Sequence, residues 1–348
     1  MIRWLGDASL MGPLSDRRQA GQLFHMMGPV VHLRDADTCG VARGLLLRLV
    51  DHGELRRIAK SAFVRTSDWE AGSAWERFRL QSVGFGMCIA PDAHLTGASA
   101  SALLILPTLS GPPALPIAIR PGDPHTGHDR TPFGRVRRGY LPAGHRTIRS
   151  RVRTVSPAFA AVDAARHQGP LEGLVVMDAV LHSGVHRESV WDVIRNMLAY
   201  PGIKTVQWAL EHADARAESP LETLGRHSFL SAGLPPPLSN VWVRTDATWF
   251  RVDHLIPSTG VILEADGAVK YNNRPDADAI VRSEKERERL LRQAGFAVGR
   301  YSWSEAVNAP RTIPSRAAQA GRSRPPGPPP TCWTLEPPAR TNSLTPFT

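Results

Sequence analysis

The apolar residues of the chain follow two different spacings, which predict helices in some segments and strands in others. Between residues 42 and 52 they recur every three to four positions, as on the buried face of a helix: Leu45, Leu46, Leu49 and Val50. Between residues 249 and 265 they form two apolar runs separated by turn residues at 257–260, as in a pair of strands. The chain is therefore predicted to be an α+β or α/β protein.

Residues 28–66 have the order of elements expected of a DNA-binding module. The helix predicted over 42–52 ends at Gly53, and two short strands, 55–58 and 62–65, follow it. A helix, a turn, a second helix and a β-ribbon describe a winged helix-turn-helix. Residues 1–27 precede this module as an N-terminal extension.

Composition divides the remainder of the chain into three segments. Residues 67–205 mix short strands with helices, and no chemistry is assigned to this middle region. Residues 206–304 return to strongly patterned helices and strands. From residue 305 to 348 no periodic apolar pattern remains, and ten prolines fall in the last 43 residues. This last segment is predicted to be a disordered, proline-rich tail.

Three carboxylates are expected to meet at the end of the two strands between 249 and 265. Glu264 and Asp266 are two residues apart, so their side chains share a face, and Asp253 lies on the neighbouring strand. Clustered carboxylates repel one another unless a cation offsets their charge. Mg²⁺ takes one or two protein carboxylates together with water and phosphate oxygens. The segment therefore predicts a Mg²⁺ or Mn²⁺ site; in the alternative interpretation the aspartates are turn residues and Glu264 is a carboxylate at the rim.

The order of motifs around these carboxylates resembles the PD-(D/E)xK nuclease superfamily, in its branch of very-short-patch-repair-like endonuclease domains. The resemblance rests on a helix that opens at Glu218–Glu222, a strand aspartate at Asp253, an E-x-D-G segment at 264–267, and a charged helix that ends at Gly295-Phe296. It spans about Glu218 to Trp303. The ordered set is more specific than the E-x-D-G segment alone, and it implies a restriction-endonuclease-like sheet flanked by helices.

This resemblance implies a metal-dependent endonuclease that hydrolyses DNA. Asp253 and Glu264 would ligate Mg²⁺ or Mn²⁺, and Asp266 would ligate the ion or position a water molecule. Glu222 would complete the shell, and Lys270 would stabilise the charge that develops on the phosphorus centre. The sequence departs from the superfamily pattern at one point, because Asp266 stands where the E-x-K lysine is usual.

Glu222 also has a purely structural explanation. Ser219, Pro220 and Glu222 fit a capping box, with serine at the cap, proline at the first helical position and glutamate at the third. A glutamate in that position satisfies backbone groups at the start of the helix. If Glu222 serves only as a cap, Glu218 is the other candidate for the metal site.

Residues 28–66 are similar to the N-terminal domain of AbiEi-type antitoxins. The similarity rests on the step Gly53-Glu54-Leu55 and the pair Phe63-Val64. It implies DNA binding and a cognate toxin as a second partner. The basic residues expected to contact DNA are Arg43 and Arg48 in the groove, and Arg56, Arg57 and Lys60 on phosphates. In the alternative interpretation the module binds protein and these residues form a solvated face.

The charge of the chain agrees with a polyanionic partner. The net charge is +10 and the isoelectric point is about 10.3. Only four of the 42 basic residues are lysine, so codon bias in a GC-rich genome is a second source of this charge. The three cysteines, Cys39, Cys88 and Cys332, are far apart and fit a reducing cytoplasm. The apolar runs are too short to predict a membrane span.

Two functions of different classes follow from these patterns. The first is a metal-dependent DNA endonuclease with an N-terminal DNA-binding module. The second is a non-catalytic DNA-binding antitoxin or transcriptional autorepressor that retains a nuclease-like fold. A purely structural interaction module is a third, weaker interpretation.

Overall fold

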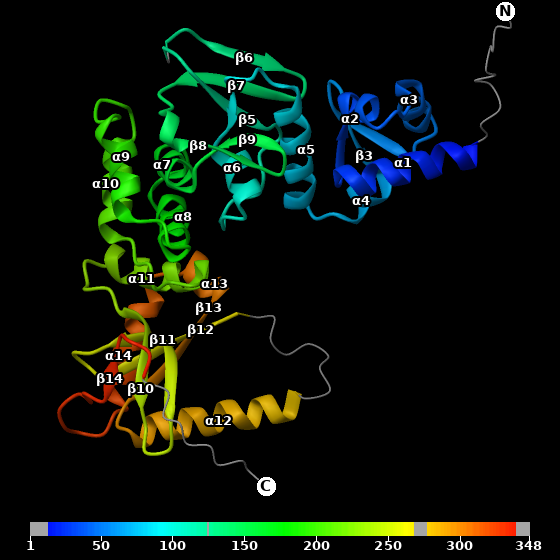
Figure 1. Cartoon of the computed structure of the whole chain (residues 1–348). Coiled ribbons are helices and arrows are strands. Elements are labelled where there is room, and N and C mark those ends of the chain that lie inside the picture. Colours follow the sequence, from blue (N-terminus) through cyan, green and yellow to red (C-terminus); the bar gives the residue numbers. More distant parts are fainter. Residues whose placement is uncertain (1–12, 124, 268–276, 339–348) are drawn as a thin grey trace, which may run out of the picture. The chain divides into compact units, whose positions relative to one another are not determined.

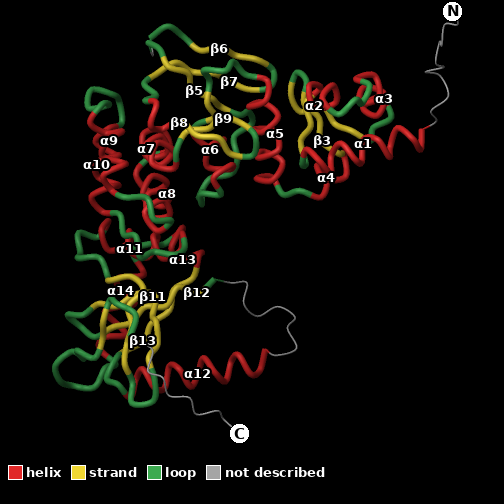
Figure 2. Tube along the Cα trace, in the orientation of Figure 1, coloured by secondary structure: helices red, strands yellow, loops and turns green. Residues whose placement is uncertain are grey.

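The computed structural model describes residues 13–123, 125–267 and 277–338. Helices and mixed sheets alternate along the chain, so the protein has an α+β fold, as predicted (Figures 1 and 2). The chain divides into two compact units. The first contains Met1–Val180 and Val185–Glu211, and the second contains Leu181–Gly184 and His212–Thr348. Among the described helices, none is both long and apolar enough to cross a membrane.

The first unit begins with a small three-stranded module. Its elements are α1 (Pro13–Met27), β1 (Val30–His32), α2 (Leu33–Thr38), α3 (Arg43–Asp51), β2 (Leu55–Ala59) and β3 (Ala62–Arg65). The strands lie in the order β1-β3-β2, and the helix predicted over 42–52 is α3. Leu23 and Phe24 of α1 are buried in the same core as Leu46 and Phe63. Residues 13–27 are therefore part of this module rather than an extension that precedes it.

A six-stranded mixed sheet with helices makes up the rest of the first unit. The strands are β4 (His94–Leu95), β5 (Ile117–Pro121), β6 (His128–Thr131), β7 (Gly134–Gly139), β8 (Arg146–Arg149) and β9 (Val152–Val155), in the order β6-β7-β5-β4-β9-β8. The helices are α4 (Thr66–Ala71), α5 (Ala74–Cys88), α6 (Gly97–Leu104), α7 (Pro157–Gln168), α8 (Pro170–His182), α9 (Arg187–Arg195) and α10 (Ile203–His212). Gly134 packs so closely on Phe85 of α5 that an added Cβ would lie 2.7 Å from the ring.

The second unit is built on a five-stranded mixed sheet. Its elements are α11 (Pro220–Ser231), β10 (Leu238–Arg244), β11 (Trp249–Ile256), β12 (Val261–Asp266), α12 (Ala277–Gln293), β13 (Ala297–Ser302), α13 (Trp303–Asn308), α14 (Thr312–Arg322) and β14 (Trp333–Thr334). The strand order is β13-β12-β11-β10-β14, and β12 and β13 are the parallel pair. Leu255 and Ile262 of the sheet share a core with Leu291 of α12 and with Phe296.

One expectation about this unit is wrong. The tail predicted over 305–348 contains α14, which packs on β12 and β13, and β14, which pairs with β10. The helix α14 buries Ile313 and Ala317, an apolar pair too small to stand out against the surrounding prolines.

Candidate functional site

The predicted carboxylates lie where β11 and β12 separate. Backbone pairing runs from Ile256–Val261 to His254–Leu263, and one further step of this register brings Asp253 opposite Glu264. At that step Asp253 Oδ2 accepts a hydrogen bond from the backbone N–H of Ala265, at 2.7 Å. The Asp253 side chain thus takes the place of a backbone acceptor for the N–H of Ala265. Its carboxyl group lies beside that of Glu264.

The carboxyl group of Glu264 lies in an environment that disfavours its charged form. Its side chain is buried, with 7% of the residue exposed. Burial raises the pKa of Glu264 to about 7, the negative charge of Asp253 adds to the rise, and the Arg287 guanidinium opposes it. A proton or a cation is therefore needed near neutral pH to balance two adjacent carboxyl groups.

Arg287 of α12 supplies part of this balance. Its Nη2 lies 2.9 Å from Glu264 Oε1, although the angle is not that of a hydrogen bond. The same guanidinium donates to the backbone carbonyl of Arg251 at 2.7 Å and lies over the ring of Phe250. The partner of Arg287 on a different element could not be read from helical spacing.

Glu222 approaches the pair from the start of α11. Ser219 caps this helix as predicted, and its hydroxyl donates to Glu222 Oε1 at 2.7 Å. Glu222 Oε2 accepts from the backbone N–H of Glu218 at 3.0 Å and from the Asn240 amide at 2.6 Å. Burial raises the pKa of Glu222, these donors lower it, and Asp253 raises it further. The capping role is thus present, and Asn240, which has a left-handed backbone, is a contributor that the motif did not reveal.

Asp266 lies near a different group of charged residues. Its Oδ2 lies 3.6 Å from Arg300 Nη1, and Glu284 and Glu288 of α12 lie at similar distances from the same guanidinium. Within the described part of the chain, no three His, Cys, Asp or Glu side chains are grouped as metal ligands. The structure thus brings Asp253 and Glu264 together but does not add Asp266 to them. Lys270 lies outside the described residues.

Two buried ring side chains, His254 and Tyr301, connect the elements that carry the site. His254 Nε2 lies 2.9 Å from the Tyr301 hydroxyl, which donates to the backbone carbonyl of Leu221 at 3.1 Å. Burial lowers the pKa of His254 to about 4, so its ring is neutral at physiological pH. An added Cβ at Gly225 would lie 2.2 Å from the same hydroxyl. These contacts tie α11 to β11 and β13, and no sequence motif pointed to them.

The five basic residues expected to contact DNA are exposed, but four of them already have partners within the first unit. Arg43 pairs with Asp37 at 2.7 Å, and Arg48 pairs with Asp16 at 2.8 Å. Arg56 lies over the ring of Trp69, and Arg57 donates to the carbonyls of Ala59 and Lys60. The side chains of Arg43 and Arg48 remain more than half exposed, so phosphate oxygens can reach them.

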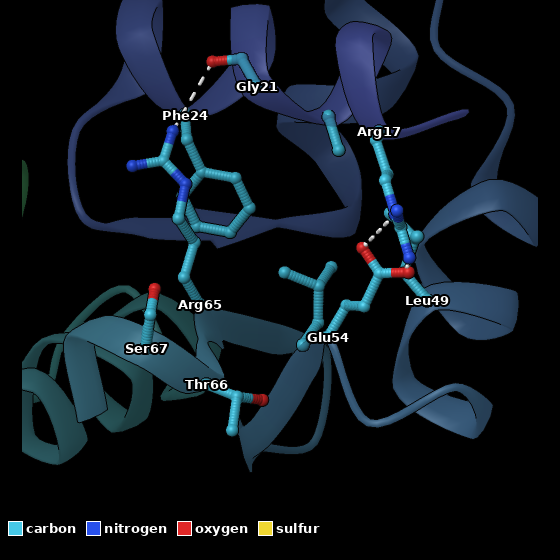
Figure 3. A pocket seen from close by; sticks show the side chains of 10 residues that line it. Arg17, Gly21, Phe24, Leu49, Glu54, Arg65, Thr66 and Ser67 are labelled. Atoms are coloured by element: carbon cyan, nitrogen blue, oxygen red, sulfur yellow. Dashed lines mark hydrogen bonds and ion pairs between the residues drawn. The ribbon is translucent and has the colours of Figure 1, made fainter. Parts of the chain in front are cut away.

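A pocket of about 320 Å³ lies between α1 and the β-ribbon of the first unit (Figure 3). Arg17 and Glu54 point toward one another across it, with both carboxylate oxygens 2.9 Å from Arg17 Nε. On the other side Arg65 covers the ring of Phe24 and donates to the carbonyl of Gly21. Both cations of the pocket are thus engaged by the protein itself.

Comparisons with known proteins give little further information. No protein-family model matches the sequence, and no curated protein matches it significantly. One solved structure that is similar is the RV2827C protein from Mycobacterium tuberculosis. The two share 16% sequence identity over 66% of this chain and 84% of that one, with a TM-score of 0.36.

Proposed function

We propose that the second unit is a metal-dependent endonuclease that cleaves DNA held by the first unit. The observation that carries this proposal is the pair of adjacent carboxyl groups at Asp253 and Glu264, with the pKa of Glu264 raised to about 7. Strongly perturbed carboxyl groups of this kind are typical of functional sites. The order of motif residues on α11, β11, β12 and α12 supports the same interpretation.

The residues present fit a divalent cation. Mg²⁺ and Mn²⁺ accept two carboxylates and keep several water molecules, so a third protein ligand is not required. Asp253 and Glu264 would hold the ion, and binding would offset the repulsion that now raises the pKa of Glu264. A cation bound there supplies Lewis acidity and lowers the pKa of a bound water.

The remaining side chains position the pair. Asp253 is fixed by the N–H of Ala265, and Glu222 anchors the start of α11 through Ser219 and Asn240. His254 is neutral and therefore adds no positive charge that would repel a cation. The residues that would bind DNA are different ones, the exposed arginines of α3 and the β-ribbon in the first unit.

A specific observation favours the second function, a non-catalytic DNA-binding antitoxin or autorepressor. The guanidinium of Arg287 already neutralises Glu264, and Arg300 engages Asp266. A site whose charges are balanced internally resembles a retained scaffold more than a vacant metal site. In this alternative the second unit contacts a cognate toxin instead of hydrolysing DNA.

Purified full-length protein incubated with supercoiled plasmid distinguishes the two functions. We expect nicking with Mg²⁺ or Mn²⁺ and none with chelator. Glu264→Gln and Asp253→Asn should each nearly abolish nicking, because the amide retains the shape but not the charge that holds the ion. Binding of a labelled duplex should persist in both variants, and Ca²⁺ should permit binding without cleavage. Equal nicking by wild type and Glu264→Gln, or none under any condition, would favour the antitoxin function.

A further inference from the structure

Most of the excess positive charge of the chain lies in a segment to which the motifs assign no role. Residues 116–153 contain nine arginines and two aspartates, with no lysine or glutamate, which accounts for +7 of the net charge of +10. This segment builds β5 to β9 of the six-stranded sheet. Charge concentrated in this way is the electrostatic pattern expected of a surface that binds a polyanion.

The hairpin of β8 and β9 is the most basic part of this segment. Arg149 pairs with Val152 at its end, so Ser150 and Arg151 form a two-residue turn. Both have left-handed backbones, with φ of 49° and 66°. Turns of this kind favour Asn-Gly, because other residues are strained there. A serine and an arginine in these positions indicate that something besides local folding fixes the turn.

The contacts of Arg151 fix the conformation of this turn. Its Nη1 donates to the backbone carbonyl of Met27 at 2.8 Å, and its Nη2 forms an ion pair with Asp35. Asp35 is nearly buried and caps α2 by accepting the N–H of His32 at 2.8 Å. The hairpin is therefore fastened to the helix-turn-helix module of the same unit, so both can face one ligand.

The exposed side chains of the hairpin include arginines, a residue type that contacts the backbone of nucleic acids. Arg149 and Arg153 are exposed, and within the described part of the chain neither forms an ion pair. Ile148 is the cross-strand partner of Arg153 and is 69% exposed. A single exposed isoleucine is unremarkable by itself. Because cross-strand partners share a face of the ribbon, Ile148 lies beside Arg153, whereas Arg149, which pairs with Val152, belongs to the other face. An exposed apolar side chain beside a cation is the combination found in proteins that press an apolar side chain into the minor groove while cations contact phosphates.

We propose that the β8–β9 hairpin is a second contact surface for duplex DNA. Arg149 and Arg153 contact phosphates from the two faces of the ribbon, and Ile148 packs against the groove beside Arg153. The anchor formed by Arg151 and Asp35 holds this surface beside the helix-turn-helix module. The proposal does not depend on cleavage, since it concerns only how the first unit holds its ligand.

The test compares two double variants of the full-length protein. Arg149→Gln/Arg153→Gln removes the hairpin charges, and Arg311→Gln/Arg322→Gln removes two exposed charges from the second unit as a matched control. Binding of a fluorescent duplex is followed by anisotropy at several salt concentrations, with chelator present so that no cleavage occurs. The hairpin variant should lower the salt-dependence slope by about 1.8 and weaken binding roughly 60-fold at 0.1 M salt, since each phosphate contact contributes about 0.9. The control should change neither by a comparable amount.

Further variants separate specific contact from lost charge or lost folding. Arg149→Lys/Arg153→Lys should restore the slope, and Ile148→Ala should weaken binding without changing the slope. Thermal unfolding followed by circular dichroism should match wild type in all four variants. If the hairpin variant binds like wild type, or if the control loses as much affinity, the hairpin is not a DNA surface. Loss of binding that lysine does not restore would also overturn the proposal.

Discussion

At the scale of single residues, the carboxyl group of Glu264 lies in an environment that disfavours its charged form. Glu264 is buried beside Asp253, and the Arg287 guanidinium offsets part of its charge. A protein selected for stability alone would replace such a glutamate by an amide or an apolar residue. Retention of the acid is therefore the strongest residue-level argument for a function at this position.

The first prediction concerns the stability of Glu264→Gln as a function of pH. The folded-state pKa of about 7 lies above the ordinary value of 4.5, so the folded protein binds a proton that the unfolded chain has lost. Stability contributed by this proton is present below pH 4.5 and disappears as the pH rises through 7. Glu264→Gln should therefore gain about 1–3 kcal/mol relative to wild type at pH 8, and less at pH 5. Melting temperatures measured across this range test the sign.

A matched control for this prediction lies on α12. Glu286 is exposed, and its hydrogen bond to Arg289 lowers the pKa of Glu286. Glu286→Gln should therefore show no gain at pH 8. A gain that does not depend on pH in Glu264→Gln would mean that packing, and not protonation, determines its stability.

The second prediction concerns Arg287, which competes with any cation for Glu264. Arg287→Gln removes this competitor while keeping most of the side-chain volume. Mn²⁺ should then bind about tenfold more tightly at pH 8, equivalent to roughly 1.4 kcal/mol. Calorimetric titration of metal into full-length protein measures the change. Arg289→Gln, two residues along the helix and exposed, should leave the affinity unchanged. Weaker Mn²⁺ binding in Arg287→Gln would show that the arginine supports the site.

At the scale of elements, local patterns were predicted well and distant contacts were not. Ser219 caps α11 as its neighbouring proline indicated, because a cap depends on a few consecutive residues. The pair of strands predicted over 249–265 likewise placed Asp253 on the strand next to Glu264. The partners of Arg287 and Asp266 lie on other elements, so no spacing along the chain could identify them.

The third prediction concerns α14, the helix found where a disordered tail was predicted. Ile313 is 1% exposed on a helix that packs on β12 and β13. Ile313→Ala should lower the free energy of unfolding of the second unit by about 2–4 kcal/mol, because it leaves a cavity beside the sheet. Ser315→Ala on the exposed side of the same helix should be nearly neutral. Denaturant unfolding followed by tryptophan fluorescence compares them, and equal stability of the two variants would mean that α14 contributes nothing.

At the scale of the whole molecule, the two units divide the proposed function between them. The basic strands and the three-stranded module with its arginines belong to the first unit, whereas both clustered carboxyl groups belong to the second. Separation of this kind allows a variant to lose metal binding and keep DNA binding. It also means that a single unfolding transition is not expected, since each unit has its own core.

The fourth prediction uses this division. Scanning calorimetry of the full-length protein should resolve two transitions, and Mn²⁺ should raise only one of them. At a free metal concentration of 100 times the dissociation constant, the metal-binding unit gains about 2.7 kcal/mol, which corresponds to a shift of roughly 5–10 °C for a domain of this size. Glu264→Gln should remove the shift but keep both transitions, whereas duplex DNA should stabilise the other transition in both proteins. If Mn²⁺ shifts neither transition, or shifts them equally in wild type and Glu264→Gln, the carboxyl pair does not hold a cation. The two-unit protein would then be better explained as a DNA-binding antitoxin.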